Sequence, residues 1–136
     1  MKEIFKLNII VDEFNEVCGN KATARMILFH GDVESPYFTG KICNGGVDTQ
    51  YQPKGEANHL SARYIMEGID DAGNSCKIFI ENNGTYKGDG KLVTKPLILT
   101  NSERLKWLEE EELSGKVCNE DGKLVIRIYQ DKDTNE

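Results

Sequence analysis

The sequence predicts an all-β protein, built either as a β-sandwich or as an up-and-down β-barrel. Apolar and polar residues alternate with period two along most of the chain, which is the pattern of half-buried strands. Clusters of Gly, Asn, Asp and Pro separate these runs at short intervals, as turns do. Eight to ten strands with almost no helix and no internal repeat are typical of both architectures. The alternation alone does not distinguish between them.

The first half of the chain contains five expected strands. Turn signals at Gly19-Asn20 and at Pro53-Lys54-Gly55 separate the first two strands and the last two. Gly45-Gly46 marks a bend or bulge between the third and the fourth. The expected strands cover residues 4–11, 24–29, 37–43, 47–51 and 60–67.

The second half is less regular. Residues 76–81 are expected as a strand, followed by a tight hairpin turn at Asn83-Gly84, since both residues tolerate positive φ. Residues 86–95 are expected as a glycine-rich loop and 96–100 as a short apolar strand. One short helix is expected from Ser102 to Leu108, where Thr100 and Glu103 match a capping box. Strands at 113–118 and 124–129 would close the fold.

Length and charge limit the classes of protein. A chain of 136 residues forms one domain, which we expect over residues 1–130, with a polar tail at 131–136. Lys and Arg total 17 against 23 acidic residues, a net charge of −6. Phosphate backbones and anionic lipid surfaces repel such a chain, so we expect neither nucleic acid nor membrane as a partner. Exposed aromatic residues, expected at Tyr37, Phe38 and Tyr129, leave a homo-oligomer open.

Four cysteines at wide, irregular spacing form no C-x-x-C pair and do not adjoin a histidine, so no metal site is expected. Free thiols in a chain without a signal sequence or an apolar span indicate a cytoplasmic protein. The phosphate, dinucleotide, zinc-protease and serine-hydrolase motifs are all missing, so no cofactor is expected.

Four short motifs occur in an order that resembles domain-of-unknown-function family 3237. They are Gly45-Gly46-Val47-Asp48, Ala62-Arg63-Tyr64, Asn82-Asn83-Gly84 and Trp107-Leu108, and the resemblance runs from about Gly31 to Tyr129. The resemblance implies a calycin-like or lipocalin-like β-barrel, an uncharacterised protein with no assigned activity. Two features depart from the family pattern: Thr49 stands where the family usually has Trp, and the turn at residues 70–75 is longer.

Polar residues inside three of the expected strands are the candidate site. Alternation places Asp48 and Gln50 on one face of a strand, and Arg63 and Glu67 on one face of another. If both faces point into a barrel, these four side chains and Asn82 converge in its lumen as ligand-binding residues. Arg63 would hold an anionic group through its planar fork, with Asp48 orienting it or acting as a base. The competing interpretation is a structural ion pair between Asp48 and Arg63.

Three functions follow from this pattern. The first is binding of a small, partly apolar and possibly anionic organic ligand in the lumen. The second is a cofactor-independent enzyme, such as an isomerase, cyclase or hydrolase, that uses the same pocket. The third is a filled barrel that acts only as an interaction module. Tyr64, one position out of phase with Arg63, is expected to face the opposite way and to pack.

Overall fold

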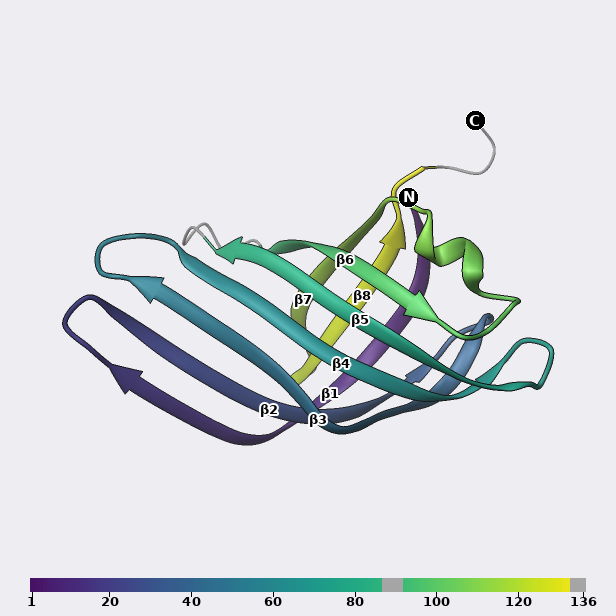
Figure 1. Ribbon diagram of the computed structural model, residues 1–136, viewed down its shortest axis with the longest axis horizontal. Helices are drawn as coiled ribbons and strands as arrows, with labels where there is room; N and C mark the ends of the chain where they lie inside the picture. The colour runs from purple at the N-terminus through teal and green to yellow at the C-terminus, as the bar shows by residue number, and fades with distance from the viewer. Residues whose placement is uncertain (87–91, 133–136) are drawn as a thin grey trace.

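The computed structural model describes residues 1–86 and 92–132 and shows one closed, eight-stranded antiparallel barrel. Each strand pairs with its sequence neighbours, and β1 also pairs with β8, which closes the sheet (Figure 1). The elements are β1 (Lys2–Cys18), β2 (Ala22–Glu34), β3 (Phe38–Pro53), β4 (Asn58–Asp70), β5 (Ser75–Tyr86), β6 (Val93–Thr100), the 3₁₀ helix η1 (Lys106–Glu109), β7 (Leu113–Glu120) and β8 (Lys123–Gln130).

Closure of the sheet through β1 excludes the sandwich. Leu7 of β1 lies opposite Val33 of β2 on one side and opposite Ile126 of β8 on the other. Directly paired residues point to the same face of a sheet, so all three side chains enter the barrel interior. All three are buried there.

The two ends of the barrel differ. The β1–β2, β3–β4, β5–β6 and β7–β8 connections share one end, as up-and-down topology requires, and Figure 1 shows the long β1–β2 and β3–β4 hairpins projecting there. At the opposite end, η1 and its flanking residues cover the interior, with Leu105 and Leu108 each 1% exposed. Phe5 and Phe38 stack edge-to-face beneath them. Buried side chains thus fill this end, which we call the packed end, and we call the opposite end, with the long β1–β2 and β3–β4 connections, the hairpin end.

A bulge interrupts β3 at the double glycine. From Ile42 to Val47 β3 advances five residues, while its partner β4 advances three, from Met66 to Arg63. Two extra residues therefore bend the strand away from its neighbour. Gly45 takes a φ of +104°, which a side chain would disfavour. The expected bend at Gly45-Gly46 is thus present, within a single continuous strand.

Several local expectations were wrong. Asn83 and Gly84 form no turn but continue β5, because they pair with β4 on one side and β6 on the other. The expected loop at 86–95 partly lies outside the described residues, and its last three residues belong to β6. The expected short helix is present as a 3₁₀ turn at Lys106–Glu109, but it has no side-chain cap, so only the capping box was wrong there. Phe38 is buried rather than exposed.

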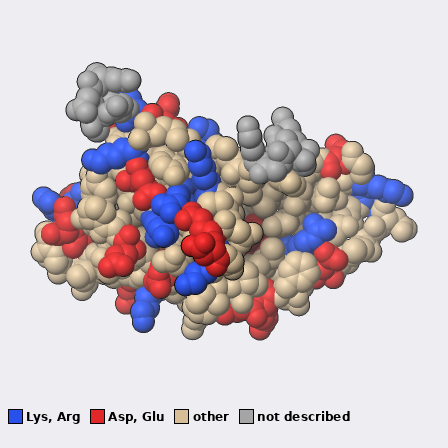
Figure 2. Space-filling model, turned by 180° about the vertical axis from the view of Figure 1, so that it is seen from behind, with Lys and Arg blue, Asp and Glu red and all other residues tan. Residues whose placement is uncertain are grey.

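Acidic and basic side chains are interspersed on the face shown in Figure 2, without a large region of one sign. Arg127, for example, bridges Glu3 and Glu120 on three neighbouring strands. Among residues 1–86 and 92–132, no helix has the length and apolarity needed to cross a bilayer.

Candidate functional site

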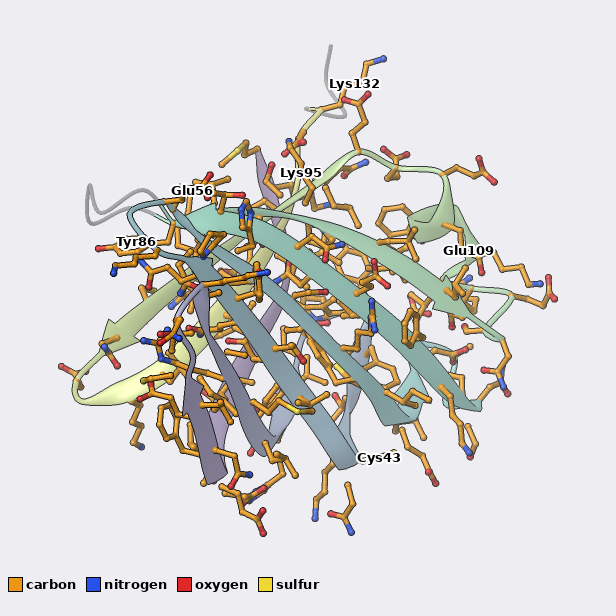
Figure 3. All side chains as sticks on the ribbon, turned by 60° about the vertical axis from the view of Figure 1, so that its left-hand side comes forward. Cys43, Glu56, Tyr86, Lys95, Glu109 and Lys132 are labelled. Atoms are coloured by element: carbon orange, nitrogen blue, oxygen red, sulfur yellow. The ribbon has the colours of Figure 1, made fainter. Side chains whose placement is uncertain are left out.

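The hairpin half of the barrel contains a cavity of about 250 Å³. Its walls are mainly apolar and come from all eight strands together with Leu92, which precedes β6. Figure 3 labels Glu56 and Tyr86 near this end and Glu109 near the packed end. The lining residues are Ile9, Val11, Ile27, Phe29, Asp48, Gln50, Leu60, Ala62, Asn82, Leu92, Thr94, Val117, Leu124 and Ile126.

One row of the sheet crosses the cavity wall and carries two of the polar groups. Asp48 of β3 lies opposite Ala62 of β4, which lies opposite Asn82 of β5. Strands are spaced by about 4.8 Å, so the backbones of Asp48 and Asn82 are separated by roughly 10 Å. The methyl group of Ala62 lies between them and leaves the space open. A ligand over Ala62 would therefore have a polar group on each side.

A chain of side-chain hydrogen bonds leads from the hairpin end to Asp48. Asn58 Nδ2 donates to Gln50 Oε1 at 2.9 Å, and Gln50 Nε2 donates to Asp48 Oδ2, also at 2.9 Å. Each amide therefore has its donor directed toward the carboxylate. The chain ends at the second carboxylate oxygen, Asp48 Oδ1, which is buried and has no hydrogen-bond partner in the part of the chain that the structure describes.

Two further side-chain oxygen atoms in the cavity wall have no hydrogen-bond partner among the described residues. Asn82 and Thr94 are each 3% exposed, and Asn82 Oδ1 and Thr94 Oγ1 are both unpaired. Buried polar atoms are nearly always hydrogen-bonded in folded proteins, and each unpaired one costs about 1–3 kcal/mol. Three such atoms, with Asp48 Oδ1, therefore face one small apolar cavity.

Burial raises the pKa of Asp48 above its ordinary value, and the hydrogen bond from Gln50 opposes that shift. Desolvation is the larger of the two effects, because a carboxylate in an apolar wall loses more hydration than one amide donor restores. No other residue among those that line the cavity is titratable. A carboxyl group with a raised pKa in such a cavity is chemically suited to bind or exchange a proton.

Gly115 of β7 makes room for these polar side chains. It lies opposite Thr94, and a Cβ atom at this position would collide with Thr94 Oγ1. The same atom would come within 3.3 Å of both terminal atoms of the Asn82 amide. The absent side chain is therefore what allows Thr94 and Asn82 to share this part of the wall.

The expected position of Arg63 was wrong. Arg63 lies opposite Val47, not opposite Asp48, and its side chain is 62% exposed on the outer face of the barrel. There its Nε donates to Glu81 at 3.1 Å. Asp48 and Arg63 therefore form neither the common site nor the alternative structural ion pair.

Glu67 is also outside, 64% exposed, with its nearest ion-pair partner Lys77 at 4.0 Å. The reason is the same for both residues: the inner face of β4 carries Ala62, Tyr64 and Met66, and period two turns the residues between them outward. Tyr64 does face away from Arg63, as expected. It packs edge-to-face on Phe29, and its hydroxyl is buried without a hydrogen-bond partner among residues 1–86 and 92–132.

The expected residues Asp48, Gln50 and Asn82 do share the cavity, whereas Thr94 and Asn58 were missed. A signal for Thr94 is present in the sequence, since Thr94, Pro96 and Ile98 alternate with more polar or exposed positions. Nothing comparable marks Asn58, because its role depends on the distance to Gln50 across a hairpin. Among the described residues, no three His, Cys, Asp or Glu side chains are placed to hold a metal ion.

The chain is similar to known proteins both in sequence and in fold. A curated relative, a UPF0311 protein of Clostridium acetobutylicum, is 35% identical over 89 residues. That alignment includes 61% of this chain and spans only 52% of the relative.

Two solved structures have the same fold along nearly the whole chain. A protein of unknown function from Clostridium acetobutylicum superimposes with a TM-score of 0.80 at 24% identity, over 95% of this chain and 96% of the other. An enzyme from Penicillium herquei superimposes with a TM-score of 0.72 at 15% identity, over 95% and 91% of the two chains. At these identities the comparison shows the fold alone.

The sequence profile of one family matches residues 1–95, more than half of the chain. The match includes the first three motifs noted above, and with them Asp48, Ala62 and Asn82 of the cavity wall. The protein therefore belongs to the DUF3237 family of proteins of unknown function.

Proposed function

We propose that this protein binds a small, mostly apolar and uncharged organic molecule in the hairpin half of its barrel, with Asp48 as the polar anchor. The observation that carries the proposal is the set of three side-chain oxygen atoms, Asp48 Oδ1, Asn82 Oδ1 and Thr94 Oγ1, that have no hydrogen-bond partner within residues 1–86 and 92–132 and belong to the lining of an apolar cavity. A ligand that donates hydrogen bonds to them would remove the free-energy cost of leaving buried polar atoms unpaired.

The size of the cavity supports a compact ligand. Its volume of about 250 Å³ exceeds the roughly 150 Å³ of an engineered apolar cavity that binds benzene. One or two fused rings with a polar substituent match this space. Because the cavity is open at this size, a filled barrel that serves only as an interaction module is less well supported.

The charge of the wall argues against the anionic ligand expected earlier. Arg63, the cation that would have held it, is on the outer face. The described lining residues include Asp48 but neither Lys nor Arg, so an anion would meet like charge without compensation. A neutral molecule avoids this cost.

Native mass spectrometry of the protein purified from its source cells tests the proposal. We expect a retained small molecule in the native protein and its loss in the Ala62→Leu variant, which fills the space between Asp48 and Asn82. The matched control is Arg63→Leu, one residue along the same strand but on the outer face, which should retain the molecule. If Ala62→Leu retained the small molecule as well as the native protein does, the molecule would not be bound in this cavity, and the proposal would be wrong.

A second candidate function is proton-transfer catalysis without a cofactor in the same cavity. The observation in its favour is the raised pKa of Asp48, an acid–base group in an apolar wall. Once the retained molecule is identified, its turnover by native protein and by Asp48→Asn separates the two functions. Catalysis requires that turnover be lost in the variant, whereas simple binding requires that native protein leave the molecule unchanged.

A further inference from the structure

We propose that Asn58 is a positioning residue which, through Gln50, makes the cavity selective for ligands that donate a hydrogen bond, such as neutral alcohols and phenols, over ketones of the same shape. This inference rests on the proposed function, since it concerns the ligand of the same cavity. It adds the chemical class of that ligand and a residue outside the cavity wall that determines it.

The direction of the hydrogen-bond chain is the first step. An amide has a donor end and an acceptor end, so the group bound to one end decides what the other end presents. Asn58 Nδ2 occupies Gln50 Oε1, and Gln50 is therefore left with its Nε2 donor facing Asp48. Asn58 itself is not among the residues that line the cavity.

The second step concerns Asp48. Its Oδ2 accepts the hydrogen bond from Gln50, and Oδ1 is the free atom. The cross-strand neighbours of Asp48 are Ile27 and Ala62, neither of which offers a donor or a charge. Donation from the ligand is thus what satisfies Oδ1.

The third step is that the rest of the polar wall has the same preference. Asn82 Oδ1 is an acceptor, and Thr94 Oγ1 is a hydroxyl that accepts as well as donates. A hydroxyl or N–H group on the ligand is complementary to all three atoms. A ketone or an ether has no donor to offer Asp48 Oδ1 or Asn82 Oδ1, and of these three atoms it is complementary to Thr94 Oγ1 alone.

Three molecules with one skeleton test the selectivity: indane, indanol and indanone. Their binding at neutral pH is measured by titration of the protein's backbone amide NMR signals. We expect indanol to bind more tightly than indane by on the order of tenfold, the usual gain for a hydrogen bond to a charged acceptor. Indanone should bind no more tightly than indane.

The variant Asn58→Asp tests the positioning role. The new carboxylate has no donor for Gln50 Oε1, so the Gln50 amide turns and presents Oε1 to Asp48. Asp48 then loses its donor and faces an acceptor, which favours the protonated, neutral form of its carboxyl group. A neutral carboxyl group accepts a weaker hydrogen bond and can itself donate to a ketone, so the preference for indanol over indane should fall below about threefold. Carbon NMR of the Asp48 carboxyl should show its titration midpoint moving upward. The control Asn83→Asp adds the same charge on the outer face of β5, beside Glu81, and should leave both readouts unchanged.

The outcomes separate this inference from the proposed function. If none of the three molecules binds, the cavity is not a site for such ligands and both fail. If indanone binds as tightly as indanol and both exceed indane, the cavity binds ligands but the wall does not select donors, and only the inference fails. If Asn58→Asp is poorly folded, Gln50→Met removes the same link and carries the same expectation.

Discussion

Replacing Asp48 by Asn should stabilise the ligand-free protein at neutral pH. The carboxylate is partly buried in an apolar wall, with one amide donor as compensation. The amide oxygen of the variant still accepts from Gln50, but as a neutral group, which costs about 1 kcal/mol of hydrogen-bond strength. Removing the charge relieves a desolvation penalty that amounts to several kcal/mol for a fully buried ion and less for this partly buried one. We expect a net gain of about 1 kcal/mol, or roughly 3–5 °C in Tm.

The gain depends on pH in a defined direction. Because the pKa of Asp48 is raised in the folded protein, the folded state holds the proton more tightly than the unfolded state. The native protein therefore loses stability as pH rises from the ordinary aspartate pKa of 3.8 through the folded-state pKa. Asp48→Asn removes this loss, so its advantage should be full at neutral pH and absent below the unfolded-state pKa.

Urea unfolding of both proteins across this pH range measures the effect. The matched control is Asp32→Asn: Asp32 also accepts one hydrogen bond from a side-chain amide, that of Asn8 at 2.9 Å, but it is exposed. Its substitution should change stability by less than about 0.5 kcal/mol at any pH. The reasoning would be refuted if Asp48→Asn destabilised the protein at neutral pH, since the carboxylate would then be better solvated or paired than the cavity geometry implies.

Three further predictions concern neighbouring residues and use the same urea assay. Tyr64→Phe removes a buried hydroxyl that has no partner, so stability should stay constant or rise by up to about 1 kcal/mol; a loss above that would mean that the hydroxyl is bonded. Gly115→Ala should cost about 1–3 kcal/mol through its collision with Thr94, and Thr94→Ala in the same chain should restore most of it, unless the backbone simply shifts. Arg63→Met removes an exposed ion pair with Glu81, so it should change stability by less than about 1 kcal/mol and leave ligand retention intact.

Local chemistry in the sequence was sufficient to predict most of the strands. Period-two alternation identified the strands, and the double glycine marked the bulge in β3, because only a glycine tolerates the φ that Gly45 adopts. The prediction failed where local preference and long-range pairing disagree. Asn83-Gly84 is a strong turn signal, yet hydrogen bonding to strands on both sides keeps it extended.

For the candidate site too, local pattern predicted some features, and others depended on long-range contacts. That Asp48 and Gln50 share a face followed from alternation, which is a property of a single strand. Alternation does not say which face points inward, and for Arg63 the choice made from its charge was wrong. The apolar residues Ala62, Tyr64 and Met66 indicate the inward face of β4 better than Arg63 does. Burying these apolar side chains is favourable, whereas burying the Arg63 charge would be costly.

Only the tertiary structure decided what the polar residues do. The cavity exists because the barrel closes between β1 and β8 and because η1 fills just one end, and both depend on contacts between residues far apart in the chain. Asp48, Asn82 and Thr94 come together because of the register of four strands, β3 to β6. The space for their side chains depends on Gly115 of a fifth strand, β7. Sequence patterns describe one strand at a time, whereas a lumen is a property of the sheet closed on itself.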